Sequence, residues 1–236
     1  MIQFYAPDIA ETLSLPEDEA KHCLRVLRHK CGDEIEVIDG KGYRYQCRIV
    51  NDNPRKMEVE IIETVLENPA WDTFITIAVA PTKNMDRMEW LVEKLTEIGV
   101  NRFVPLLCRH SERKELKIDR LQRIAVSAMK QSLKATLPEI MPMTPFADFI
   151  SNDDSEAKFI AYCDPTIPRK LLAKEYSGAK SVTILIGPEG DFDIEEIKSA
   201  LAKGMVPVTL GDNRLRTETA ALTACDTIHI LNQLHS

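Results

Sequence analysis

The first part of the chain alternates between hydrophobic and polar residues, as exposed strands do. Alternating segments at 34–38 and 43–50 flank the turn Asp39-Gly40-Lys41-Gly42, and this arrangement is typical of a β-hairpin. A further alternating segment at 57–62 predicts another strand. The pattern therefore predicts a small β-rich domain over residues 1–70.

One helix is expected within this domain. Ser14 and Glu17 have the spacing of a capping box, with Pro16 tolerated in the first turn. We therefore expect a helix from near Leu15 to about Arg28. The segment Asn68-Pro69-Ala70-Trp71 is predicted to be the linker to a second domain over residues 71–236.

The pattern changes beyond this linker. Residues 74–80 are apolar on both faces, which indicates a strand buried in a helix-covered sheet. A helical period from Met88 to Ile98 ends at Gly99. Further strands are predicted near 103–107, 158–162, 182–187 and 206–210, and further helices near 118–134, 193–203 and 218–231. Strands that alternate with helices predict an α/β domain with a mostly parallel sheet.

Composition narrows the class of protein. The 236 residues are 44% hydrophobic and 28% charged, which is ordinary for a globular protein. No apolar run approaches the roughly 20 residues of a membrane span, and the N-terminus lacks the features of a signal peptide. We expect a cytoplasmic protein without a membrane partner. The six cysteines form no C-x-x-C pair, so neither disulfides nor a metal site is predicted.

The net charge of −7 hides two basic regions. Residues 102–134 contain nine Lys and Arg against three acids, and residues 21–30 contain four Lys and Arg, two His and no acid. Because local field matters more than net charge for attracting phosphates, this acidic protein remains able to bind RNA.

Two segments rich in glycine and polar residues follow predicted strands in the second domain. We call residues 187–192 (Gly-Pro-Glu-Gly-Asp-Phe) loop A and residues 210–216 (Leu-Gly-Asp-Asn-Arg-Leu-Arg) loop B. Ligands of α/β proteins bind where strands end and helices begin. Both loops are therefore candidates for a binding site.

Several common chemistries lack their sequence signatures. The chain contains no G-x-G-x-x-G, no P-loop and no G-x-S-x-G, and His110, His229 and His235 have no evident nucleophile partner. A cofactor without phosphates, such as S-adenosylmethionine, fits two glycine loops, because Gly187, Gly190 and Gly211 permit close backbone approach. Taken singly, each glycine is better explained as a turn residue, but two such loops in one sheet, the second rich in arginine, favour a binding site.

The residues of both loops resemble the RsmE-type enzymes of the SPOUT methyltransferase superfamily, which methylate N3 of a uridine in 16S ribosomal RNA. The resemblance rests on five motifs in family order: His22-(x)3-Val26-Leu27-Arg28, Lys94-Leu95-Thr96-Glu97-Ile98-Gly99-Val100, Gln131-Ser132 before Leu137-Pro138-Glu139-Ile140, Leu185-Ile186-Gly187-Pro188-Glu189-Gly190, and Leu210-Gly211-(x)3-Leu215-Arg216-Thr217-Glu218-Thr219-Ala220. The chain departs from the family pattern in loop B, where Asn213 precedes Arg214, and at Lys134, where arginine is usual.

The resemblance implies a PUA-like β-barrel domain followed by a trefoil-knotted α/β domain, a homodimer, and S-adenosylmethionine bound in the knot loops. The cofactor-binding residues it implies are Leu185, Gly187, Glu189, Gly190, Leu210, Gly211, Leu215, Thr217 and Thr219. The partner it implies is 16S rRNA, either free or in the small ribosomal subunit.

The reaction at uridine N3 needs a proton acceptor and a group that stabilises negative charge on O2 and O4. Arg216 is the candidate stabiliser and Glu218 the candidate proton acceptor. Alternatively, Glu218 interacts with the free amides of a helix N-terminus and Thr217 is its N-cap.

The residues expected to contact RNA are His22, Arg25, Arg28, Arg109, Arg113, Lys114 and Lys134. A packed His22 is an equally good explanation of that residue. Two alternative functions stay open: a noncatalytic RNA-binding protein with a degenerate knot, and an enzyme of the same superfamily with a different methyl acceptor.

Overall fold

The computed structural model describes residues 2–67, 72–163 and 168–235, and its chain divides into two compact units. Unit 1 comprises Met1–Pro69 with Val126–Leu137, and unit 2 comprises Ala70–Ala125 with Pro138–Ser236. The predicted linker at 68–71 lies outside the described residues.

Unit 1 contains a four-stranded sheet in the order β1-β2-β3-β4. The strands are β1 (Gln3–Tyr5), β2 (Glu34–Ile38), β3 (Tyr43–Asn53) and β4 (Lys56–Leu66). β2, β3 and β4 pair antiparallel, and β1 pairs parallel with β2. The Asp39 carboxylate fixes the hairpin turn by accepting hydrogen bonds from the amides of Lys41 and Tyr43 at 2.8 and 3.1 Å. The predicted hairpin is confirmed, and closure into a barrel stays a prediction.

The helical part of unit 1 differs from the prediction at its start. The elements are α1 (Ile9–Thr12), α2 (Glu17–Lys21) and the π-helix η1 (His22–Val26). The predicted Ser14 cap is wrong, because the backbone on both sides of Ser14 pairs with β4 instead: Ser14 forms a bridge with Glu58, and the Leu15 amide donates to the Met57 carbonyl at 3.2 Å. The helix ends before Arg28, which has a φ of 64°.

Residues 126–137 fall within the range predicted for the second domain, yet they belong to unit 1. Met129 and Ala135 form a buried cluster with Ile38 of β2. The Ala135 amide donates to Glu67 Oε2 at 2.9 Å, and the Ala135 carbonyl accepts from the Gly42 amide at 3.0 Å. The amphipathic period of this segment therefore predicted its helix but not which core the helix joins.

Unit 2 is built on a sheet in the order β10-β12-β9-β11-β5-β6-β7, with β8 paired to β6. The strands are β5 (Phe74–Val79), β6 (Arg102–Leu107), β7 (Glu139–Ile140), β8 (Thr144–Pro145), β9 (Ala157–Ala161), β10 (Lys170–Leu171), β11 (Ser181–Ile186) and β12 (Val206–Thr209). Every pair between these strands is parallel, as predicted.

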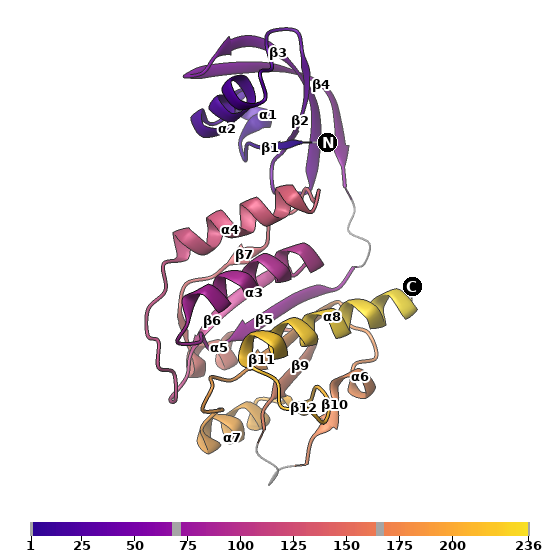
Figure 1. The fold of residues 1–236 in the computed structure, drawn as a ribbon. Helices are drawn as coiled ribbons and strands as arrows, with labels where there is room; N and C mark the ends of the chain where they lie inside the picture. The colour runs from indigo at the N-terminus through magenta and orange to yellow at the C-terminus, as the bar shows by residue number, and fades with distance from the viewer. Residues whose placement is uncertain (1, 68–71, 164–167, 236) are drawn as a thin grey trace. The chain divides into compact units, whose positions relative to one another are not determined.

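Helices cover both faces of this sheet (Figure 1). They are α3 (Met85–Ile98), α5 (Phe146–Asn152), α6 (Leu172–Glu175), α7 (Ile194–Ala202) and α8 (Thr217–His235). A further helix, α4 (Ile118–Gln131), begins in unit 2 and continues into unit 1. α8 packs against α3, β5 and β11, whereas α5 and α7 form a buried cluster with alternate residues of the central strands. None of the described helices is long and apolar enough to cross a membrane. The trefoil knot stays a prediction.

The parallel arrangement determines where polar loops gather. Because the carboxyl ends of parallel strands meet at one edge of a sheet, the segments that follow β5, β6, β9, β11 and β12 lie at a common edge. We call this the carboxyl edge of unit 2. Loops A and B both belong to it, since they follow β11 and β12.

Candidate functional site

Loop A makes a tight turn directly after β11. A Cβ atom on Gly187 would lie 3.1 Å from the buried Phe192 ring, so a side chain there would require Phe192 to shift. Asp191 has a φ of 66°, and its amide donates to the Pro188 carbonyl at 2.9 Å. Close packing within the loop itself therefore favours glycine at position 187.

Neighbouring segments of the carboxyl edge hold loop A in place. The Glu189 carboxylate accepts from the Lys83 amide at 3.0 Å, in the segment after β5. Asp191 Oδ2 accepts from the Cys163 amide at 2.8 Å, in the segment after β9. The Asp191 carbonyl also lies 3.1 Å from His110 Nδ1. Three other segments thus fix the backbone of this loop.

Asp193 connects loop A to helix α7. Its carboxylate caps the helix by accepting from the Glu195 amide at 3.0 Å, and Glu196 completes a capping box. The pKa of Asp193 is lowered, first by the hydrogen bond from the Glu195 amide and then by Arg109, whose guanidinium donates to Asp193 at 3.0 Å. Arg109, which we expected to contact RNA, thus has an ion-pair partner within unit 2.

Loop B is open by comparison. Gly211 has a φ of 134°, and a Cβ atom there would meet nothing within 4 Å. Its carbonyl accepts from the Thr209 hydroxyl at 2.8 Å. Leu210 and Leu215 are half-buried, whereas Arg214 and Arg216 are exposed and make no side-chain hydrogen bond or ion pair within the described part of the chain.

The first residues of α8 connect the two loops. The Thr217 hydroxyl donates to the Gly187 carbonyl at 3.2 Å, so Thr217 joins the end of loop B to the start of loop A. The N-cap alternative for Thr217 is wrong, because Thr217 is the first helical residue and its hydroxyl is directed to loop A. Thr219, two residues further along α8, is half-buried.

Glu218 is a buried carboxylate beside this junction. Its side chain is 9% exposed, and Oε1 lies 3.6 Å from Arg87 Nε in the first turn of α3. Oε2 is buried and accepts no hydrogen bond from any described residue. A cation at a helix N-terminus is disfavoured by the helix dipole, so the position of Arg87 is best explained by its pairing with Glu218.

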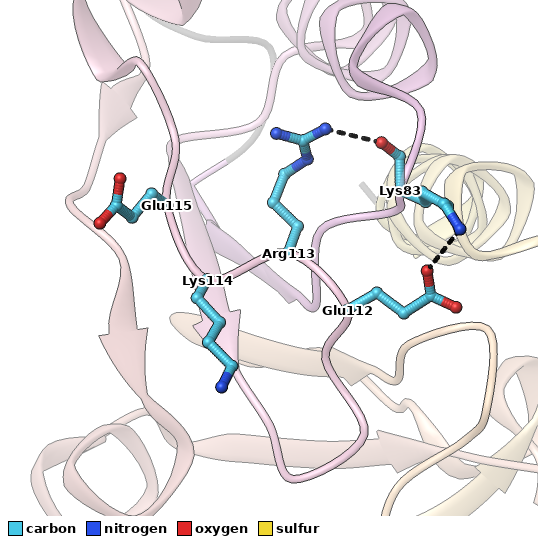
Figure 2. Close-up of a pocket in the computed structure, with 5 residues that line it drawn as sticks. All are labelled: Lys83, Glu112, Arg113, Lys114 and Glu115. Atoms are coloured by element: carbon cyan, nitrogen blue, oxygen red, sulfur yellow. Dashed lines mark hydrogen bonds and ion pairs between the residues drawn. The ribbon is translucent and has the colours of Figure 1, made fainter.

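A cavity of about 470 Å³ opens beside loop A, lined by Lys83, Glu112, Arg113, Lys114 and Glu115. Figure 2 shows Lys83 Nζ directed to Glu112, at 3.2 Å, and the Arg113 guanidinium directed to the Lys83 carbonyl, at 2.7 Å. Two residues expected to bind RNA, Arg113 and Lys114, therefore line one cavity.

The other expected RNA contacts lie in unit 1. Arg25 and Arg28 are exposed, and His22 packs edge-on against Phe4 with ring centroids 6.2 Å apart. Lys134 is half-buried in the segment 126–137. The seven residues are thus divided between the two units.

Sequence reasoning missed the segment after β5, and after β6 it named Arg109, Arg113 and Lys114 as RNA contacts but neither of their neighbours His110 and Glu112. Lys83 and Arg87 follow β5, and His110 and Glu112 follow β6, and all four contact residues of the predicted site or line its cavity. The signal was available, because both strands were predicted to be parallel to the strands that precede loops A and B. Their carboxyl ends therefore had to meet the two loops.

The residues at this edge fit an adenosyl cofactor. Gly190 and Gly211 expose backbone on two loops that Thr217 holds together through the buried Gly187, and the buried Glu218 Oε2 has no donor within the described residues. Among the residues that the structure describes, no group of three or more His, Cys, Asp or Glu could hold a metal ion, and the six cysteines are free thiols.

Two family models match the chain. An RNA methyltransferase domain matches residues 69–229, and an RNA methyltransferase PUA domain matches residues 15–62. Among curated proteins, the ribosomal RNA small subunit methyltransferase E of Aquifex aeolicus is 31% identical over 89% of this chain and 91% of its own. The protein of the same name from Buchnera aphidicola is 28% identical over 92% and 87%.

Solved structures agree with these matches. A protein of Porphyromonas gingivalis described as a probable rRNA-methyltransferase is 44% identical, with a TM-score of 0.95 over the full length of both chains. A ribosomal RNA small subunit methyltransferase E of Neisseria gonorrhoeae, bound to S-adenosyl methionine, is 28% identical, with a TM-score of 0.85 over 98% of both chains. The N-terminal part of the present chain is therefore a PUA-like domain, and the C-terminal part is an α/β methyltransferase domain with a parallel sheet.

Proposed function

Because the chain belongs to the RsmE family of ribosomal RNA small subunit methyltransferases, we propose that it methylates N3 of a uridine in 16S rRNA with S-adenosylmethionine as the methyl donor. The observation that carries this proposal is the junction of loops A and B, where the Thr217 hydroxyl donates to the Gly187 carbonyl at 3.2 Å. This bond brings the two glycine segments of the family motif to one edge of the sheet.

The cofactor site consists of loop A, loop B and the start of α8. The backbone around Gly187, Gly190 and Gly211 offers amides and carbonyls to the adenine edge, and the half-buried Leu210 and Leu215 supply apolar surface around it. Leu185 is fully buried in the core of unit 2, so its part in the site is to support loop A from β11. Thr217 and Thr219 lie at the start of α8. Glu189 supports the cofactor site indirectly, because its carboxylate accepts a hydrogen bond from the Lys83 amide and so holds loop A in place. When bound, S-adenosylmethionine supplies an electrophilic methyl group on a positively charged sulfur.

The side chains of the protein supply the rest of the chemistry. Uridine N3 carries a proton, and its lone pair is delocalised into two carbonyls, so the nitrogen must lose the proton for methyl transfer to proceed. Glu218 is the proposed proton acceptor, because Arg87 occupies only its Oε1. Arg216 stabilises the negative charge that develops on the uracil oxygens, since its guanidinium has no partner within the described part of unit 2.

The RNA contacts extend over both units. Unit 1 presents Arg25 and Arg28 as exposed cations, with His22 and Lys134 in the same unit. Arg109, Arg113 and Lys114 belong to unit 2. We assign RNA recognition to the domain over residues 1–70 and catalysis to the domain over residues 71–236. A ribosomal RNA substrate implies that the protein acts in the cytoplasm.

We also propose a homodimer. α8 exposes Ile230 at 50% and Leu234 at 73%, and α3 exposes Trp90 at 42%. Burial of such residues against a second copy would remove apolar surface from water. Light scattering at several concentrations measures the assembly, and a monomer at micromolar concentration would contradict the proposal.

The activity is tested by incubating the protein with methyl-labelled S-adenosylmethionine and small ribosomal subunits from a strain that lacks this modification. We expect labelled N3-methyluridine on nucleoside analysis of the 16S rRNA. A different labelled nucleoside would show that the protein is a methyltransferase whose methyl acceptor is not uridine N3. No labelled nucleoside, together with no cofactor binding in calorimetry, would favour a noncatalytic RNA-binding protein.

A further inference from the structure

The outer side of β4 in unit 1 is a surface that neither the cofactor site nor the expected RNA contacts include. β4 is the last strand of its sheet, so it pairs with a strand only on its β3 side (Figure 1). The start of its other side is covered, because the Val59 amide donates to the Leu13 carbonyl at 2.9 Å and Ser14 forms a bridge with Glu58. This cover ends at Val59. We call residues 60–66, which follow it, the β4 edge.

The register shows which backbone groups of the β4 edge point outward. The Glu67 amide donates to the Gly42 carbonyl at 2.8 Å, next to the β3–β4 pair. Because bonded and non-bonded positions alternate along an antiparallel pair, Leu66 and Thr64 direct their amides and carbonyls away from β3. Ile61 also points outward, since the register shifts by one residue between Ile61 and Thr64. None of these outward groups has a hydrogen-bond partner among the described residues.

Apolar side chains accompany these backbone groups. Ile62 is 45% exposed, Val65 47% and Leu66 53%. An exposed edge strand of this kind is a template for pairing with another strand, and proteins usually block such edges with lysine, proline or a covering segment. The β4 edge contains neither lysine nor proline, and within the described part of unit 1 the covering segment reaches only Val59.

The charge of this strand indicates the chemistry of its partner. Residues 58–67 contain four glutamates and no lysine or arginine. Glu63 is exposed and has no ion-pair partner among the described residues, and Glu60 has only Arg48 at 3.8 Å. An acidic strand repels phosphates, which disfavours RNA at this edge. A neighbouring strand with lysine or arginine opposite Glu60 and Glu63 would instead form favourable cross-strand pairs.

We propose that the β4 edge docks a basic, extended segment of a protein of the small ribosomal subunit, which adds to the sheet as a further strand. Ile61, Thr64 and Leu66 supply the backbone hydrogen bonds, and the side chains of the edge select the sequence of the segment. Proteins that lie on ribosomal RNA neutralise its phosphates with lysine and arginine, so they carry segments of this charge. The choice of particle rests on the proposed function.

Hydrogen exchange read by mass spectrometry tests the docking on the full-length protein. In the free protein, the amides of Ile61, Thr64 and Leu66 should exchange rapidly. Small ribosomal subunits should slow all three at least about tenfold, in keeping with local opening energies. Protein-free 16S rRNA should leave them unchanged. The Val65 amide, which faces β3, is the internal control and should exchange at the same rate in all three samples.

Two substitutions test the same edge by affinity. Thr64→Pro removes one outward N–H, and proline is tolerated on an edge strand where that N–H faces solvent. It should weaken binding to small subunits about fivefold or more, as loss of a hydrogen bond predicts, and leave cofactor affinity unchanged. Thr64→Ala keeps the N–H and is the matched control. Glu63→Lys should also weaken binding, although it adds a positive charge to an RNA-binding protein.

Three results would overturn the proposal. Protection of the three amides by protein-free 16S rRNA, or tighter binding of small subunits by Glu63→Lys, would assign the edge to RNA. Slow exchange of these amides in the free protein would mean that the protein itself already covers the edge. Unchanged affinity of both Thr64→Pro and Glu63→Lys for small subunits would show that nothing docks there.

The docking and the proposed function fail separately. If small subunits protect the β4 edge but no N3-methyluridine forms, the proposed function is wrong and the docking stands. If N3-methyluridine forms without protection of the edge, the function stands and the docking is wrong.

Discussion

Loops A and B occupy equivalent places in the sheet but are held in different ways. Both carry glycine, and both follow parallel strands at the carboxyl edge of unit 2. In loop A, the Glu189 and Asp191 carboxylates accept hydrogen bonds from backbone amides of other segments, and the Phe192 ring packs against Gly187. In loop B, residues 211–214 and Arg216 are exposed, and the hydrogen bonds between Thr209 and Gly211 remain local.

This difference shows how the site divides its tasks. Loop A has its conformation fixed by hydrogen bonds and packing within the protein, so it forms a rigid wall. Loop B has few buried contacts, which is typical of segments that order when a ligand binds. We therefore expect loop A to determine whether the cofactor fits and loop B to place Arg216 for the reaction.

The largest expected effect comes from filling the space under loop A. Gly187→Val forces its side chain against Phe192, which a Cβ alone would approach at 3.1 Å. Overpacking of this kind costs about 1–3 kcal/mol, and the displaced loop should lose measurable cofactor binding. Calorimetry measures the binding, and thermal unfolding measures the stability.

Gly211→Val is the comparison in loop B. It meets no atom within 4 Å and is strained only by its φ of 134°, so cofactor affinity should fall about tenfold while binding stays measurable. Gly178→Val is the control for backbone strain alone. Gly178 has a φ of 97° and open space around it, and it precedes β11, at the opposite edge of the sheet. Normal cofactor binding by Gly187→Val would show that loop A is not the wall of the site.

The next effect concerns the two arginines of loop B. Arg216→Ala should reduce kcat by about 100-fold or more and leave the cofactor Kd unchanged, because its charge is needed as the uracil oxygens become negative. Arg214→Ala removes an equally exposed arginine of the same loop and should have a much smaller effect. Equal losses of kcat and cofactor affinity in Arg216→Ala would assign that residue to cofactor binding.

A smaller effect should follow from separating Arg87 and Glu218. The pair links the start of α8 to α3 at 3.6 Å, with a nearly buried carboxylate and an arginine side chain that is 37% exposed. Because solvent screens the arginine, Arg87→Gln should lower the free energy of unfolding by about 1–2 kcal/mol, between the values for exposed and buried pairs. In a double-mutant cycle, Glu218→Gln should add less in the Arg87→Gln background than alone. Strict additivity would mean that the two side chains do not interact.

The smallest effect is a pH dependence of the helix cap that follows loop A. The pKa of Asp193 is lowered by the Glu195 amide and by Arg109, so its contribution to stability is present above the pKa of the unfolded chain. That contribution is lost as pH falls through the lower pKa of the folded state. The protection factor of the Glu195 amide, the ratio by which it exchanges more slowly than an unprotected amide at the same pH, should therefore fall below about pH 4, the ordinary range of an aspartate, with no matching change in loop B. Asp193→Asn, which keeps a capping side chain, should remove the pH dependence. An unchanged profile in that variant would contradict this role.

The sequence was informative wherever local pattern and tertiary structure agree. The hairpin, the parallel strands and the long helices follow from periodicity and turn residues. α5, β7 and β10 were missed because two to seven residues carry too little periodic signal. Ser14 was misjudged because pairing with β4 overrides its capping signal. The family motifs included Gly187 and Thr217. The hydrogen bond between these residues could not be predicted, because they are 30 positions apart in the sequence and only the folded structure shows them in contact.

Hydrogen exchange with and without S-adenosylmethionine tests the central claim most directly. Without cofactor, the amides of loop A that are hydrogen-bonded within the protein should already exchange slowly, and those of loop B should exchange rapidly. With saturating cofactor, exchange in loop B should slow at least about tenfold, in keeping with local opening energies, and loop A should change little. Unchanged exchange in both loops would show that they do not form the cofactor site.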